Sequence, residues 1–309
     1  MGNAGIISAI CNVTASLARK VYDDFQNKKK QKFNEKLCAV RKIFDNYNLV
    51  SGLHSFMSFE NEKYKRILPP LMRQIYRKIQ YKIFGIEAAF KGMNTSDIFD
   101  KIYEDGIWGK DELGRSTSGS GSHSFEAVNA YVEAVKVEIN TLGCTNIVDL
   151  GCGDFSIGKS FINNCNKYVA CDISSVILKR NRQTYQFENL EFKQINLAED
   201  ELPKGDIAFI RQVLQHLSNT EIKKFVDYLN KVKPYRYLLV TEHIPSEKGF
   251  VPNIDKPSGS NIRFLLNSGI ELHKDPFLLE YKSKRIICQV NKKTVGANAL
   301  IRSTLYELT

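Results

Sequence analysis

The second half of the chain alternates short apolar runs with segments of helical spacing. The apolar runs are typical of buried strands and occupy residues 146–150, 168–171, 190–195, 207–210 and 237–241. Between them, apolar residues recur every three or four positions, as over residues 222–229, where Ser218 and Glu221 form a capping box. The pattern predicts a Rossmann-like, doubly wound α/β fold with a mostly parallel sheet.

The end of the chain predicts an antiparallel element. Two apolar stretches, Phe277–Tyr281 and Ile286–Val290, flank the polar residues 282–285 and indicate the two strands of a terminal hairpin. We expect this hairpin to complete a domain that spans residues 96–292. Residues 293–309 are expected to form a C-terminal tail.

The sequence of the first 95 residues predicts a basic helical extension. Apolar stripes run through residues 19–48 and 70–90 among many lysines and arginines. Such amphipathic helices suit an anionic membrane surface, and they equally allow one stripe to pack on the other. The serine- and glycine-rich residues 118–122 have the composition of a linker. Because they follow an aromatic stretch and closely precede the first strand, we interpret residues 96–125 as a lid.

Composition constrains the partners and the compartment. The formal net charge is +10 and 43% of the residues are apolar, which predicts a folded protein attracted to phosphorylated glycans, lipid headgroups or nucleic acid. The seven cysteines form no Cys-x-x-Cys pair and no zinc-like cluster, so we expect reduced thiols, no metal site and a cytoplasmic protein. No segment is apolar and long enough to predict a membrane span. Peripheral contact with the inner face of the membrane through residues 1–90 is the remaining hypothesis for a membrane interaction.

The most informative motif is Ile-Val-Asp-Leu-Gly-Cys-Gly-Asp-Phe-Ser-Ile-Gly at residues 147–158. It predicts a buried strand that enters a sharp turn, where Gly151 and Gly153 allow positive φ angles and a close approach of a ligand. A dinucleotide-binding turn needs a third glycine where this chain has Ser156. The carboxylate of Asp149 beside the turn suits a cationic ligand better than a pyrophosphate.

Further candidates follow the later strands. Asp172 ends the second strand, where a carboxylate can accept hydrogen bonds from a ribose diol. The fourth strand runs into Arg211-Gln-Val-Leu-Gln-His-Leu217. His216 in this segment is a candidate general base, with Glu242 and His243 at the end of the fifth strand as alternatives. Asp206, at the opposite end of the fourth strand, is interpreted as structural.

The motif at residues 147–158 resembles the first motif of class I S-adenosylmethionine-dependent methyltransferases. Together with the aromatic stretch around Trp108, the 211–217 segment and a late Asn253-x-Asp255, the chain resembles bacterial methyltransferases found with surface-polysaccharide biosynthesis. Two positions depart from that group, which commonly has Trp at Phe155 and Asp at Gln212. The second departure removes a carboxylate from a position near the methionine end of the cofactor.

The resemblance implies S-adenosyl-L-methionine as the cofactor and assigns three sets of residues. The cofactor is expected to contact Asp149, Gly151, Cys152, Gly153, Asp154, Asp172, Ile173, Asn196, Leu197, Arg211 and Gln212. The lid and the acceptor site are expected to include Tyr103, Trp108, Ser118, Gly119, Ser120 and Arg263. The candidates for catalysis are His216, Glu242 and His243.

Three functions are compatible with these residues. The first is O-methylation of a sugar of a bacterial surface glycan or its precursor. The second is methylation of RNA or of a small molecule. RNA is disfavoured because the basic residues concentrate in the N-terminal helices and because no Asn-Pro-Pro-Tyr motif, typical of enzymes that methylate amino groups of bases, follows the fourth strand. The third is a non-catalytic partner of a glycosyltransferase that docks through residues 1–90, which the intact Asp149, Gly151, Gly153 and Asp172 disfavour.

Overall fold

The structure is a computed structural model that describes residues 90–119, 125–246, 249–294 and 297–308. Within the chain, residues 90–309 form a compact unit of their own. The helices that the sequence predicts over residues 19–48 and 70–90 lie outside the described residues. In the part of the chain that is described, no helix combines the length and the apolarity needed to cross a bilayer.

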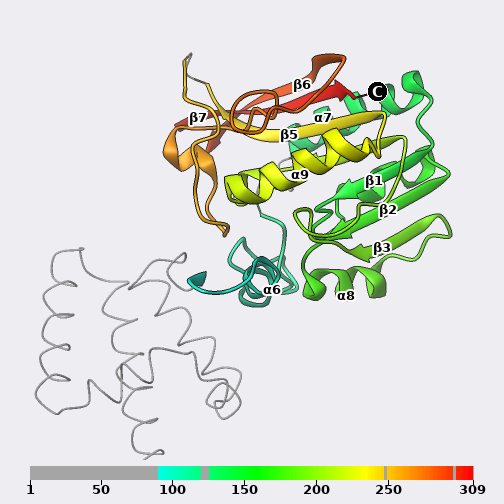
Figure 1. The fold of residues 1–309 in the computed structure, drawn as a ribbon. Helices are drawn as coiled ribbons and strands as arrows, with labels where there is room; N and C mark the ends of the chain where they lie inside the picture. Colours follow the sequence, from blue (N-terminus) through cyan, green and yellow to red (C-terminus); the bar gives the residue numbers. More distant parts are fainter. Residues whose placement is uncertain (1–89, 120–124, 247–248, 295–296, 309) are drawn as a thin grey trace, which may run out of the picture. The chain divides into compact units, whose positions relative to one another are not determined.

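One sheet of seven strands, in the order β3-β2-β1-β4-β5-β7-β6, forms the centre of this unit (Figure 1). Its first five strands along the chain are parallel: β1 (Asn146–Leu150), β2 (Lys167–Asp172), β3 (Leu190–Gln194), β4 (Ile207–Arg211) and β5 (Tyr237–Pro245). All five were predicted, and the predicted fold class is confirmed. The order reverses direction at β1, so the crevice between β1 and β4 is the place where such sheets bind ligands.

Helices cover both faces of the sheet. Figure 1 shows α9 (Asn219–Val232) in front of the sheet and α7 (Phe125–Leu142) behind it, while α8 (Ser175–Thr184) lies beside β2 and β3. The capping box predicted for α9 is confirmed, because Ser218 accepts from the Glu221 N–H and the Glu221 carboxylate accepts from the Ser218 N–H. The lid begins with α6 (Thr95–Asp105).

The helices predicted directly after the first and fourth strands are wrong in kind. The structure has short 3₁₀ helices there, η3 (Gly158–Asn164) and η4 (Leu214–His216). A third one, η5 (Arg263–Leu266), lies in the long connection after β5. In η4, the carboxylate of Glu242 binds the backbone N–H groups of Val213 and Leu214, so the segment is organised by a tertiary contact rather than by helical periodicity.

The hairpin exists, but its predicted position is wrong. It consists of β6 (Ser283–Thr294) and β7 (Ala297–Glu307), and residues 277–281 are not a strand. The expected C-terminal tail is therefore mostly β7, which inserts antiparallel between β5 and β6. This pairing also lengthens β5, since its register with β7 continues as far as Pro245 opposite Ala299. Glu242 and His243 thus lie within β5 and not at its end.

The main apolar core lies between the sheet and α7. Val135 and Ile139 of α7 pack against strand residues such as Ile147 and Phe209, all of them 0–1% exposed. Burial on this scale fixes the parallel strands relative to one another. Because their carboxyl ends meet at one edge, the residues that follow β1, β2, β3 and β4 are brought together there.

Candidate active site

A cleft of about 1080 Å³, part of it open to solvent, lies at the carboxyl ends of β1 to β4. Residues of α6 and of the loop after it form the opposite side. All of the residues predicted to contact the cofactor line this cleft: Asp149, Gly151, Cys152, Gly153, Asp154, Asp172, Ile173, Asn196, Leu197, Arg211 and Gln212. The structure therefore brings the predicted cofactor contacts together in one cleft, and their contact with the cofactor stays a prediction.

The turn after β1 requires glycine for steric reasons. Gly151 has φ 87° and Gly153 has φ 55°, both in the left-handed region. A Cβ atom at Gly151 would collide with Val213, and one at Gly153 would collide with the hydroxyl of Ser118. The N–H groups of Gly151 and Cys152 both donate to the carbonyl oxygen of Cys171 at 2.8 Å, which fixes the turn against β2.

Asp149, the fourth residue of β1, places a buried carboxyl at the bottom of the cleft. Its side chain accepts a hydrogen bond of 3.0 Å from the Tyr168 hydroxyl. Burial raises the pKa of Asp149 to about 7, and the nearby charge of Asp172 raises it further, while Arg211 acts in the opposite direction. A cationic group bound in the cleft would favour the ionised carboxylate.

Asp172 ends β2 and holds the turn from the other side. Its two oxygens accept the N–H groups of Gly153 and Ser174, each at 2.9 Å. Burial nevertheless raises its pKa to about 6. Each carboxylate oxygen has a second lone pair, so Asp172 can accept further hydrogen bonds from hydroxyl groups of a ligand.

The lid lies against this turn through reciprocal hydrogen bonds. The N–H of Ser118 donates to Asp154 Oδ2 at 2.9 Å, and the Asp154 N–H donates to Ser118 Oγ at 2.7 Å. The hydroxyls of Ser118 and Tyr103 are 3.2 Å apart. Trp108 contacts the ring of Tyr103 edge-on, with 5.5 Å between centroids, and the ring of His216 at 4.8 Å.

The donor set of the cleft fits S-adenosylmethionine. Two buried carboxyls, Asp149 and Asp172, line one cleft, and the charge of Asp172 contributes to the raised pKa of Asp149. A ligand with an ammonium group, a sulfonium and ribose hydroxyls would favour the ionised form of both. Among the described residues, no group of three or more His, Cys, Asp or Glu side chains is arranged so that it could hold a metal ion. Residues 148–233 match the family model described as a methyltransferase domain. The chain therefore contains a methyltransferase domain, a class of enzyme that uses S-adenosylmethionine.

Solved structures of methyltransferases are similar to this chain at low identity. N-methyltransferase NodS from Bradyrhizobium japonicum WM9, in complex with S-adenosyl-L-homocysteine, is 11% identical with a TM-score of 0.46, over 68% of this chain and 100% of that one. Magnesium protoporphyrin IX methyltransferase (ChlM) from Synechocystis PCC 6803, with bound SAM, is 15% identical with a TM-score of 0.43, over 70% and 98%. Human N-acetylserotonin methyltransferase (ASMT), in complex with SAM, is 14% identical with a TM-score of 0.44, over 76% and 70%.

These similarities do not indicate the acceptor of this methyltransferase, because both the identities and the scores are low. A search of curated proteins finds no match. The methyltransferase assignment therefore rests on the family match of residues 148–233, which does not identify the acceptor.

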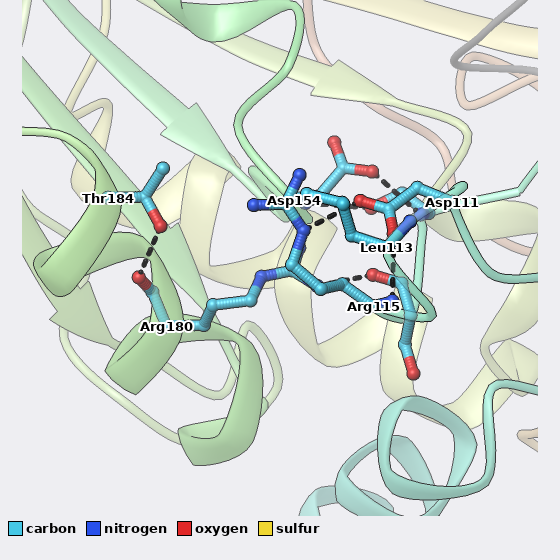
Figure 2. A network of polar contacts seen from close by, with 8 residues as sticks. Asp111, Leu113, Arg115, Asp154, Arg180 and Thr184 are labelled. Atoms are coloured by element: carbon cyan, nitrogen blue, oxygen red, sulfur yellow. Dashed lines mark hydrogen bonds and ion pairs between the residues drawn. The ribbon is translucent and has the colours of Figure 1, made fainter.

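The lid of the methyltransferase is also held on its outer side. Asp111 accepts hydrogen bonds from the N–H groups of Leu113 and Arg115 and from Arg115 Nε, and it closes the loop between α6 and Ser118. Arg180 of α8 donates to the backbone carbonyl of Ser116. Figure 2 shows the side chain of Arg180 extending towards this loop, where Arg115 and Asp111 lie close to Asp154. Of the other lid predictions, Gly119 packs on Trp108 without lining the cleft, and Ser120 lies outside the described residues.

His216 lines the cleft but is a weak base. Its Nδ1 is 3.2 Å from the carbonyl oxygen of Gly259, and its Nε2 is 3.3 Å from the amide nitrogen of Gln215. Burial and the charge of Lys256 lower its pKa to about 3. This geometry favours a neutral ring that shapes the cleft, and its catalytic role stays a prediction.

The other two catalytic candidates do not line the cleft. Glu242 binds the backbone of η4, and His243 Nδ1 is 2.9 Å from Gln215 Oε1. Both side chains are buried within β5, on opposite faces of the sheet, because successive residues of a strand alternate. Any role that they have in the reaction is indirect.

Arg263, which was predicted at the acceptor site, does not line the cleft. Its side chain is 0% exposed and donates to the carbonyl oxygens of Ile254 and Leu214 and to Asn219 Oδ1, at 2.7–3.0 Å. All these partners are protein atoms on three separate segments. Arg263 therefore fastens the long connection after β5 to η4 and to α9.

Sequence reasoning missed several residues that line the cleft: Thr95, Tyr131, Phe161, Tyr168 and Glu221. The Tyr168 hydroxyl was the easiest to find, because Ala170, two residues further along β2, pairs with Asp149 and lies on the same face. Asn196 was predicted as a cofactor contact, and in the structure its side chain also makes a local hydrogen bond. Its Oδ1 accepts from the Ala198 N–H at 3.0 Å, so its side chain organises the turn that borders the cleft.

Proposed function

We propose that this methyltransferase O-methylates a sugar hydroxyl of a bacterial surface glycan or of its precursor. The observation that carries this proposal is the charge of the cleft. Four of its lining residues are acidic, namely Asp149, Asp154, Asp172 and Glu221, and Arg211 is the only lysine or arginine among the described residues that line it. Such a cleft repels the phosphates of RNA and suits an uncharged, hydroxyl-rich acceptor.

On the cofactor side, the residues of the chain bind and orient. S-adenosylmethionine supplies an activated methyl group on a sulfonium sulfur. Asp172 is placed to accept ribose hydroxyls, and Asp149 offers negative charge for a cationic group. The lid residues Tyr103 and Trp108 cover the turn and exclude water from it.

On the acceptor side, the aromatic rings of Tyr103, Trp108 and His216 line the same cleft as the polar side chain of Gln212. An acceptor hydroxyl held here would attack in line with the sulfonium. The new O–C bond would form as the S–C bond breaks, the sulfur would keep the bonding electrons as a neutral thioether, and the hydroxyl proton would pass to solvent water. With a pKa of about 3, His216 orients the acceptor better than it removes that proton.

Methyl transfer to defined acceptors tests the proposal. The full chain is incubated with labelled S-adenosylmethionine and, separately, with neutral oligosaccharides, phosphorylated glycans and RNA, and the methylated product is identified by mass spectrometry. We expect a gain of one methyl group on a sugar, and at least tenfold less product with the Asp172→Asn variant at subsaturating S-adenosylmethionine. The glycan acceptor would be refuted if the methyl label appeared on RNA or on a small molecule and on none of the sugars.

Surface glycans from cells with and without the gene give the same test in vivo. A difference of one methyl group per repeating unit supports the proposal, and identical glycan masses contradict it. The predicted contacts of residues 1–90 with a membrane or with a glycosyltransferase remain proposals about a region outside the described residues. Flotation of the full chain with anionic and neutral vesicles tests the membrane contact.

A further inference from the structure

A second cavity lies on the sheet face formed by β5, β7 and β6, next to residues 270–273. We call it the hairpin cavity. It measures about 790 Å³, part of it open to solvent, and none of its lining residues lines the cofactor cleft. The methyltransferase chemistry described above makes no use of it.

The antiparallel register brings the lining side chains together. Glu242 of β5 is paired with Arg302 of β7, Val240 with Thr304, and Tyr306 of β7 with Lys284 of β6. Directly paired residues share one face of a sheet, so charged and apolar groups lie side by side on the floor of the hairpin cavity. This combination suits a small molecule with one charged group and an apolar body.

The cations of the hairpin cavity are only partly neutralised. Arg285 is paired with Glu138, and the acidic Glu271 is paired with Lys274 at 2.5 Å. Lys284 Nζ contacts His273 Nε2 at 2.5 Å, and Arg302 Nε donates to the uncharged Gln289. No ion pair of Lys284 or Arg302 occurs among the described residues.

The charge balance of Lys284 points to a missing anion. Its pKa is lowered by burial and by the positive charges of Lys274 and Arg302, with only Glu271 acting in the other direction. Two cations that face one cavity and repel each other are stabilised when an anion binds between them.

Glu242 is the second, independent observation. Its side chain is 2% exposed, and its Oε1 accepts from the N–H groups of Val213 and Leu214 at 3.2 and 2.9 Å. Glu242 lines the hairpin cavity, and its buried Oε2 has no hydrogen-bond partner among the described residues. Burial raises the pKa of Glu242 to about 8, so this carboxyl changes its protonation close to neutral pH, and a neighbouring anion would favour its uncharged form.

We propose that the hairpin cavity binds a small molecule that carries an oxyanion, a carboxylate or a phosphate, at Lys284 and Arg302, and that Glu242 couples its occupancy to the cofactor cleft. The coupling follows a short physical path. An anion in the cavity favours the uncharged form of Glu242, which weakens its hold on the Val213 N–H. Val213 in turn lines the cofactor cleft and packs against Gly151.

Binding of simple probes tests the site. Hexanoate, hexyl phosphate and the uncharged hexanol are titrated calorimetrically into the full chain. We expect saturable binding of at least one of the two anions and none of hexanol, and the two anions distinguish a carboxylate from a phosphate site. Lys284→Gln and Arg302→Gln should each weaken binding about tenfold, since a hydrogen bond to a charged group is lost. Lys282→Gln, an exposed lysine two positions away that does not line the cavity, is the matched control.

The site is refuted if neither anion binds, if hexanol binds equally well, or if Lys282→Gln weakens binding as much as Lys284→Gln. Because S-adenosylhomocysteine is titrated into the same samples, its intact binding would show that the methyltransferase assignment survives that failure. Coupling is measured as the change in affinity for S-adenosylhomocysteine when the anion is present. It is also measured as the fluorescence of Trp108, the only tryptophan, which contacts His216 of η4. We expect a change of about threefold or more that disappears in Glu242→Gln, and equal affinities would refute the coupling.

Discussion

The two walls of the cofactor cleft are built on different principles. The wall formed by Asp149, the 151–154 turn and Asp172 consists of backbone held by parallel strands, with two carboxyls buried against their electrostatic preference. The lid wall of Tyr103, Trp108 and Ser118 consists of rings and hydroxyls on a helix end and a loop. The first wall has one geometry open to it, whereas the second depends on a few side-chain contacts. Changes in the first wall should therefore reduce cofactor affinity strongly, and changes in the second should reduce it only slightly.

The largest effect is expected at Gly151, where alanine is strained by the φ of 87° and collides with Val213. Gly151→Ala should lower the affinity for S-adenosylhomocysteine by about 100-fold or more, measured by calorimetry. In Gly151→Ala/Val213→Ala the collision is removed and only the backbone strain is left, so part of the affinity should return. If the single variant binds normally, the turn is not a rigid wall.

Asp172→Asn comes next. The change removes the negative charge that accepts two backbone N–H groups and, in our proposal, the ribose hydroxyls. We expect an affinity loss of about 10- to 100-fold, typical of charged hydrogen bonds. Asp206→Asn is the control: Asp206 accepts the N–H groups of Thr145 and Asn146 at the opposite end of the sheet, so it should reduce thermal stability and leave binding unchanged.

The pH dependence of binding sharpens the contrast further. Because burial raises the pKa of Asp149 to about 7 and that of Asp172 to about 6, the folded protein holds protons that the unfolded chain releases near pH 4. Stability of the unliganded protein should thus fall as the pH rises from about 4 to 7, while affinity for a ligand that prefers ionised carboxylates rises, by about tenfold from pH 6 to 8. Asp149→Asn should flatten the upper part of the affinity curve. A flat curve for the unaltered protein would contradict the assigned role of Asp149.

The smallest effect is expected in the lid. Ser118→Ala leaves the Asp154 N–H without its 2.7 Å acceptor but keeps the Ser118 N–H bond to the Asp154 carboxylate. We expect about a fivefold rise in the KM for S-adenosylmethionine, corresponding to one ordinary hydrogen bond, with little change in melting temperature. A loss as large as that of Gly151→Ala would show that the two walls do not differ as described.

The same contrast explains what the sequence could and could not predict. The turn at 151–154 was predictable because its chemistry is local: an acid, two glycines and a strand are contiguous. Arg263 was not, since a motif-based reading expects an arginine to meet an acceptor, and its true partners are two backbone carbonyls and an amide distant in sequence. The hairpin was misplaced because β6 and β7 are long and mostly polar on their exposed face, so apolar runs mark only a part of β6 and a stretch outside both strands. His216 was located in the cleft, but its basicity depends on burial and on Lys256, which spacing does not reveal.

The insertion of β7 between β5 and β6 has a consequence for synthesis. During synthesis on a ribosome, each of the parallel strands β2 to β5 emerges after a strand with which it pairs in the sheet. β6, in contrast, emerges before β7, the strand that joins it to the sheet. Until residues 297–307 have left the exit tunnel, β5 has an open edge and β6 has no partner. The nascent enzyme must therefore protect an unpaired strand edge until the last strand of the sheet is made, and a stop codon a dozen residues early would leave that edge exposed permanently.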